Sequence, residues 1–67
     1  MTTTEEKIRA LSAKIERMAA EPIKNKNIDL ARAQIFYALL EIRMGVPEMA
    51  ERRIDIINIY LKWGESA

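Results

Sequence analysis

The sequence predicts an all-α domain of three helices at about residues 4–20, 28–44 and 47–63, the last two forming an antiparallel hairpin. We expect two chains to assemble into a dimeric helical bundle. Three observations favour this fold. Apolar residues recur at helical intervals along most of the chain, and proline or glycine stands near the expected helix boundaries. The central helical pattern has two apolar faces, and one neighbouring layer cannot cover both.

The size of the chain limits how it can be stabilised. Its 67 residues form a single domain, 1–67, and a core this small is usually marginal without disulfides, a metal or oligomerisation. The absence of cysteine and histidine excludes disulfides, thiol chemistry and the common zinc, copper and haem ligands. We therefore expect no metal and no cofactor, and stability that comes from oligomerisation or well-packed helices.

Charge and hydropathy do not indicate a particular partner. Eleven basic and ten acidic side chains leave a net charge of +1, far from the positive field of a dedicated nucleic-acid binder. No apolar run approaches the ~20 residues that span a bilayer, and the N-terminus lacks the basic and apolar regions of a signal peptide. We expect a cytoplasmic protein without membrane contact.

The first helix should begin in the threonine run. Thr3 followed by Glu6, or Thr2 followed by Glu5, has the spacing of a capping box. Apolar residues then recur at alternating intervals of three and four, as in a narrow coiled-coil seam: Ile8, Leu11, Ile15 and Met18. Two heptads are too few for an isolated coiled coil, so this seam should dock on the central helix. Pro22 stops the first helix because it disfavours helical geometry at the preceding residue.

The connection before the central helix, residues 21–27, is the only locally basic loop of the sequence. Its Lys24 and Lys26 could contact a phosphate or an acidic partner, and a solvated turn is the alternative interpretation. Asn27 is the expected N-cap of the central helix, because asparagine side chains satisfy free backbone N–H groups at this position. Asp29 in the first turn complements the helix dipole.

The central helix carries two apolar stripes on nearly opposite sides. The aliphatic stripe, which should form the core within one chain, contains Ile28, Ala31, Ile35, Ala38, Leu39 and Ile42. The aromatic stripe, which should form the subunit interface, contains Leu30, Ala33, Phe36, Tyr37, Leu40 and Met44. An exchange of the two roles is the alternative. A second copy of the chain is the simplest third layer, and two-fold dimers are the commonest closed assemblies.

The turn between the last two helices is very short. Gly45 should end the central helix in the left-handed conformation, and Pro47 suits the first position of the third helix. The turn looks superficially like that of a DNA-binding helix-turn-helix. However, Glu41 and Glu51 stand where that motif requires a small residue and an aliphatic core residue. The hairpin is therefore the preferred interpretation.

The third helix is apolar over roughly half of its circumference, which is more than one neighbour requires. Arg53 projects from this apolar arc, so it should pair with a carboxylate, with Glu41 as the candidate, or reach water. Ile59 on the polar side is either a lone exposed residue or a subunit contact. Gly64 should stop the helix. We expect the aliphatic stripe to contact residues of the first and third helices, namely Ile8, Leu11, Ile15, Ile54, Ile57 and Leu61.

Residues capable of catalysis are few. No histidine is present as a base near neutral pH and no cysteine as a nucleophile. The carboxylate pairs Glu5 with Glu6 and Glu48 with Glu51 fall on faces expected to be solvated, where a shifted pKa is not expected. Both glycines stand at expected helix ends, so no glycine-rich phosphate loop is present. We do not expect an enzyme.

The leading function hypothesis is a noncatalytic protein–protein interaction module, an adaptor, inhibitor or assembly factor that acts as a homodimer. It rests on the lack of catalytic residues and on the surplus of apolar helix surface. The alternative is a small dimeric nucleic-acid-binding regulator that uses a basic face. Candidate contacts with another protein or with nucleic acid are Lys24, Lys26, Arg52, Arg53, Ile59 and Trp63.

Overall fold

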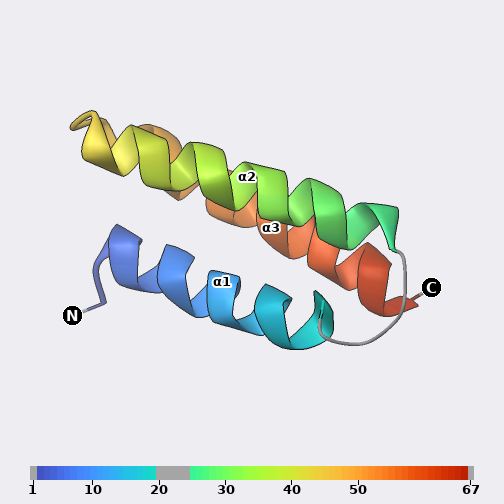
Figure 1. Cartoon of the computed structure of the whole chain (residues 1–67). Coiled ribbons are helices and arrows are strands. Elements are labelled where there is room, and N and C mark those ends of the chain that lie inside the picture. The colour runs from blue at the N-terminus through green and yellow to red at the C-terminus, as the bar shows by residue number, and fades with distance from the viewer. Residues whose placement is uncertain (1, 20–24, 67) are drawn as a thin grey trace.

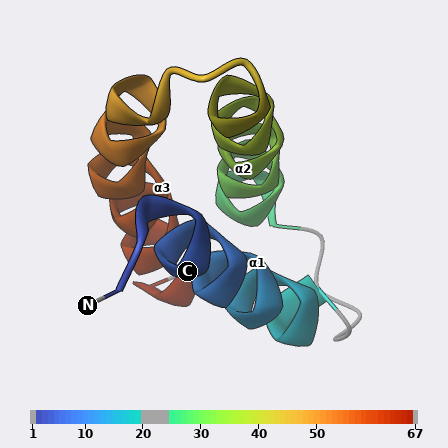
Figure 2. The same ribbon diagram turned by 90° about the vertical axis from the view of Figure 1, so that its left-hand side faces the viewer.

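The computed structural model describes residues 2–19 and 25–66, and three helices account for nearly all of them (Figure 1). These are α1 (Thr4–Ala19), α2 (Lys26–Arg43) and α3 (Pro47–Ser66). The predicted all-helical class and the number of helices are confirmed. The molecule extends over 35 × 19 × 16 Å. α2 and α3 lie side by side, and α1 packs across one side of this pair (Figures 1 and 2).

The start of α1 agrees with the first of the two predicted capping positions. The Thr3 hydroxyl accepts a hydrogen bond from the Glu6 backbone N–H at 3.1 Å, and the Thr3 carbonyl accepts one from the Lys7 N–H at 3.1 Å. Thr3 is therefore the residue that satisfies the free donors of the first turn. The predicted end of this helix at residue 20 and the stop at Pro22 lie outside the described residues.

The start of α2 corrects the prediction that Asn27 is its N-cap. The N-cap is Asn25, whose backbone is extended and whose side chain accepts the Asn27 N–H at 3.0 Å. The same Asn25 side chain donates to the Gly64 carbonyl of α3 at 3.0 Å. This second bond joins two helix ends, so a tertiary contact explains why the first of two similar asparagines is the cap.

The turn after α2 forms the Schellman motif, a helix end closed by a glycine with positive φ. Gly45 has φ +85°, its N–H binds the Ile42 carbonyl at 3.1 Å, and the Val46 N–H binds the Glu41 carbonyl at 2.9 Å. α3 then begins at Pro47, as predicted. Glycine adopts this backbone conformation without the steric cost that a Cβ atom would add.

The end of α3 corrects a second prediction, because Gly64 does not stop the helix, which continues to Ser66. A Cβ atom at Gly64 would lie 2.6 Å from Cδ1 of Ile28. The glycine therefore allows close approach of α3 to the beginning of α2, where the Asn25 side chain also binds it. Gly64 thus has a packing role rather than a terminating one.

The core lies between α1 and the inner sides of α2 and α3. The buried apolar residues are Ile8, Ile15, Ile28, Ala31, Ile35, Ala38, Ala50, Ile57 and Leu61. Leu11, Met18, Leu39, Ile42, Ile54 and Tyr60 pack against them and are partly buried. The predicted docking of the α1 seam on the aliphatic stripe is confirmed. Each helix of the part that the structure describes is too short or too polar to cross a membrane.

Candidate functional site

The aromatic stripe of α2 remains exposed in the single chain. Phe36 is 66% exposed and Met44 71%, whereas the neighbouring core residue Ile35 is only 5% exposed. Leu30, Tyr37 and Leu40 are each more than two-fifths exposed, and Ala33 is also exposed. The three helices therefore cover only one of the two apolar stripes.

α3 contributes exposed apolar residues of its own. Met49, Ile56 and Trp63 follow one another at intervals of seven residues, so they lie along one side of the helix. The Trp63 ring packs edge to face on the partly buried Tyr60 ring, with 6.0 Å between centroids. Ile59 is 46% exposed beside this row. The excess width of the apolar arc on α3 is therefore exposed surface.

α1 lies on one side of the α2–α3 pair and leaves the opposite side uncovered (Figure 2). On α3, Glu51 pairs with α1, and Ile56 lies about 140° around the helix from it. On α2, Arg32 pairs with α1, and Tyr37 lies about 140° around the helix from it. Phe36 lies only about 40° around from Arg32, so it belongs to the outer edge of this surface. We call this combined surface the open face; its residues are Leu30, Ala33, Phe36, Tyr37, Leu40, Met44, Met49, Ile56 and Trp63.

A polar network joins the two helices at the inner edge of the open face. Arg53 of α3 donates from Nε to Glu41 Oε1 at 2.6 Å and from Nη2 to Glu41 Oε2 at 3.0 Å. Its Nη1 donates to Gln34 Oε1 at 2.7 Å. The guanidinium carbon lies 5.3 Å from the centroid of the Tyr37 ring. The predicted pairing of Arg53 with Glu41 is confirmed.

The network neutralises a carboxylate that lies in the contact between α2 and α3. The side chain of Glu41 is only 9% exposed, and an unpaired charge there would be costly. The two-pronged bond with Arg53 supplies the opposite charge in the planar geometry that carboxylates favour. The same bond to Glu41 raises the pKa of Arg53 above its usual value, against a smaller opposing effect of desolvation. Arg53 is therefore held within the fold by Glu41.

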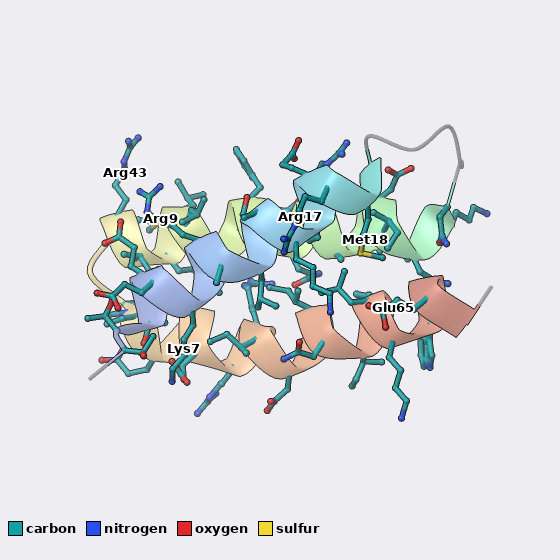
Figure 3. All side chains as sticks on the ribbon, turned by 90° about the horizontal axis from the view of Figure 1, so that it is seen from below. Lys7, Arg9, Arg17, Met18, Arg43 and Glu65 are labelled. Carbon is teal, nitrogen blue, oxygen red and sulfur yellow. The ribbon has the colours of Figure 1, made fainter. Side chains whose placement is uncertain are left out.

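The opposite edge of α3 is held to α1 by exposed polar contacts. Glu51 accepts a bond from the Thr4 hydroxyl at 2.7 Å and from Lys7 Nζ at 2.9 Å. Both bonds, first that of Thr4 and then that of Lys7, lower the pKa of Glu51 below its ordinary value. Lys14 pairs with Glu65, which is labelled in Figure 3, at 3.1 Å further along the same contact.

A shallow depression lies beside these contacts at the start of α3. Its lining residues are Thr4, Pro47, Glu48, Glu51, Arg52 and Asp55. Three carboxylates line it, and within the described residues no group of histidine, cysteine or carboxylate side chains has an arrangement that would hold a metal ion. We therefore assign no chemistry to this depression and regard the open face as the candidate site.

The structure separates the basic residues predicted to contact a partner. Lys26 is exposed at the beginning of α2, next to the end of α3 where Gly64 lies. Arg52 is exposed near the opposite end of the pair, in the second turn of α3. Arg53 is bound to Glu41. Lys24 lies outside the described residues.

Sequence reasoning identified the α2 half of the open face but missed most of the α3 half. Met49 and Ile56 belong to the wide apolar arc of the third helix, and the helical pattern alone does not separate them from the core. The signal that could have identified them was the width of this arc, since its outer edge repeats every seven residues from Met49 to Trp63.

Comparison of the chain with protein-family models, with the curated proteins and with the solved structures found no match.

Proposed function

We infer that the protein is a noncatalytic protein–protein interaction module that acts as a homodimer. In this arrangement α2 and α3 form an antiparallel hairpin, and the open faces of two hairpins pack together as a four-helix layer. Each α1 then covers the outer side of its own hairpin. An adaptor, inhibitor or assembly factor would present the remaining surfaces to another protein.

The observation that carries this proposal is the extent of the open face. Nine large apolar side chains are at least two-fifths exposed in the described part of the chain, and eight of them belong to the open face; Ile59 borders it. Apolar patches of this kind on a small soluble protein usually mark an interaction surface. The face continues over both helices, so it matches the inner side of a helix bundle.

A second copy is the partner that best fits the surface. An interface about a two-fold axis brings the same patch of both subunits together, and it must be complementary to itself. The open face is apolar at its centre on both helices, so two copies would place apolar residues opposite each other. The second subunit also covers apolar surface that a chain of 67 residues is too small to bury by itself.

The experiment that tests the dimer is a measurement of solution mass by light scattering over a dilution series. Leu40→Glu should convert the dimer to a monomer, because it places a charge inside the proposed interface. We expect the dissociation constant to rise at least about 100-fold, which corresponds to about 3 kcal/mol. Since Leu40 is exposed in the single chain, the helical circular dichroism spectrum should be retained.

The matched control is Asn58→Glu. It adds the same charge on α3 at an exposed position, and Asn58 lies about 160° around the helix from Ile56. This variant should remain a dimer. A wild-type protein that is monomeric at every concentration, or a Leu40→Glu variant that remains dimeric, would contradict the proposal.

A further inference from the structure

The geometry points to one arrangement of the dimer: two α2 helices pack antiparallel about a two-fold axis beside Phe36, with reciprocal ion pairs between Asp29 of one chain and Arg43 of the other. This inference rests on the proposed dimer and specifies its register. Three independent features of the open face support it: the spacing of the apolar residues, the position of the charges, and the match between α2 and α3.

The apolar residues of α2 have the spacing of a coiled-coil seam. Leu30, Ala33, Tyr37, Leu40 and Met44 follow one another at intervals of three, four, three and four residues. Such spacing is that of the positions that face a partner helix in a coiled coil. When the second helix runs in the opposite direction about an axis level with residues 35 and 36, Leu30 faces Leu40 and Ala33 faces Tyr37. Each bulky aromatic ring therefore meets a small alanine, which favours close packing.

The residues on the outer side of this seam determine its direction. Asp29, Phe36 and Arg43 lie one heptad apart, along the edge of the seam that faces away from α3. In an antiparallel pair centred on Phe36, Asp29 of each chain lies opposite Arg43 of the other. A parallel pair would place Asp29 beside Asp29 and Arg43 beside Arg43. Flanking charges of this kind set the orientation of coiled-coil partners.

Asp29 and Arg43 of the same chain cannot form an ion pair with each other. Asp29 and Arg43 stand 14 residues apart on one helix, a distance of about 21 Å. No ion pair with another described residue is formed by either side chain. Arg43 projects away from the other helices at the end of α2 (Figure 3). Both side chains are therefore available to a second chain.

The exposed apolar residues of α3 are compatible with the same two-fold axis. Met49 and Trp63 each lie seven residues from Ile56, so an axis beside Ile56 would bring Met49 of one chain opposite Trp63 of the other. The contacts of Arg53 with Gln34 and Glu41, and of Gly64 with Asn25, set the level of α3 against α2.

By those contacts Ile56 is level with about residue 34 of α2, because each step forward along α3 corresponds to one step back along α2. An axis perpendicular to both helices that passes Phe36 therefore passes within about 3 Å of the level of Ile56. One two-fold axis can therefore relate α2 to the α2 of the second chain and α3 to the α3 of the second chain. An interface that contains both helices requires such a common axis.

Single cysteine variants test this register, since the chain has no cysteine of its own. Under mild oxidation, Phe36→Cys should form a disulfide-linked dimer, because the two copies of position 36 meet beside the axis. Leu30→Cys and Met44→Cys are the matched controls. Their equivalent positions would be about 17 Å and about 26 Å apart along the helices, beyond the ~7 Å between Cα atoms that a disulfide allows.

Charge reversal gives a second readout. Asp29→Arg and Arg43→Asp should each weaken the dimer about 10-fold, because each sets like charges against each other. The double variant should recover most of that loss, since it restores both pairs with exchanged signs. Circular dichroism of each variant checks that α2 still forms, because both changes also oppose the helix dipole.

The outcomes distinguish the register from the dimer itself. Efficient linking of Leu30→Cys and Met44→Cys would indicate parallel helices and overturn the inference. A wild-type dimer in which Phe36→Cys fails to link, or in which the double charge reversal is weaker than both single ones, would overturn it as well. In both cases the dimer remains. A monomeric wild-type protein would instead contradict the proposed function.

Discussion

The two sides of the α2–α3 pair contrast in how their apolar residues are covered. Ile57 is fully buried beneath α1, whereas the preceding residue, Ile56, is 40% exposed on the open face. Ile35 and Phe36 differ in the same way on α2. Both sides are apolar, although the covered side is aliphatic and the open face is richer in aromatic and methionine side chains. The difference is whether this chain contains a helix that packs on that side.

The polar contacts of the two sides differ as well. On the covered side, pairs such as Lys7–Glu51 lie at the exposed rim, where ion pairs contribute little to stability. Between the helices at the edge of the open face, the Arg53–Glu41 pair is largely shielded from water. Packing of a second chain would shield it further. The covered side is therefore stabilised by apolar packing, whereas the open face borders a polar network that fixes how α2 lies against α3.

The contrast is tested most strongly by two adjacent isoleucines. Ile57→Ala should lower the free energy of unfolding by about 3 kcal/mol, because it leaves a cavity in the core. Ile56→Ala removes the same atoms from the open face, so it should weaken dimerisation and leave the folding of the monomer nearly unchanged. Urea unfolding at fixed, low protein concentration measures the first effect, and light scattering the second. If Ile56→Ala and Ile57→Ala lowered the stability of the monomer equally, the proposed difference between the open face and the covered side would be wrong.

The polar network gives a prediction of intermediate size. Arg53→Met should destabilise the protein by about 2 kcal/mol, because Glu41 is then left buried without its charged partner. Replacing both residues, Glu41→Leu with Arg53→Met, should restore much of the stability, since neither charge then remains unpaired. Thermal unfolding at one protein concentration compares the variants. A double variant as unstable as the sum of the single ones would show that the pair is not coupled.

Much of the fold followed from the sequence because local rules and core packing agreed. The Thr3 cap, the glycine at the end of α2 and the seam of α1 each depend on residues within one or two turns. Even the Arg53–Glu41 pair was predictable, because a cation within an apolar arc requires a partner. Such features need little knowledge of the tertiary structure.

The errors occurred where a distant residue decides the local structure. Asn25 rather than Asn27 caps α2, and Asn25 also binds Gly64, 39 positions away. Gly64 remains helical because Ile28 packs close against it. For the candidate site, only Trp63 of the exposed row on α3 was predicted, because the residues of this row share one wide arc with the core. Only the position of α1 divides that arc into a covered part and an open part.

The smallest predicted effect concerns the polar contact that holds α1 on the covered side. The pKa of Glu51 is lowered from its ordinary value of 4.5, so the folded protein holds the proton of this group less tightly than the unfolded chain does. The resulting stabilisation is present above pH 4.5 and is lost as the pH falls through the lowered value. Acid should therefore weaken the attachment of α1 to α3.

Glu51→Gln should reduce the unfolding midpoint slightly at pH 7, and this difference from wild type should shrink at an acidic pH low enough to protonate Glu51 itself. Asp55→Asn is the matched control, because Asp55 lines the same depression without a described hydrogen bond to α1. Urea titrations of the three proteins at both pH values measure the effect. The same pH dependence in both variants would show that the general charge of α3, and not the contact with Thr4 and Lys7, is responsible. The open face contains no carboxylate of its own, so the part of the acid response that depends on Glu51 arises on the covered side alone.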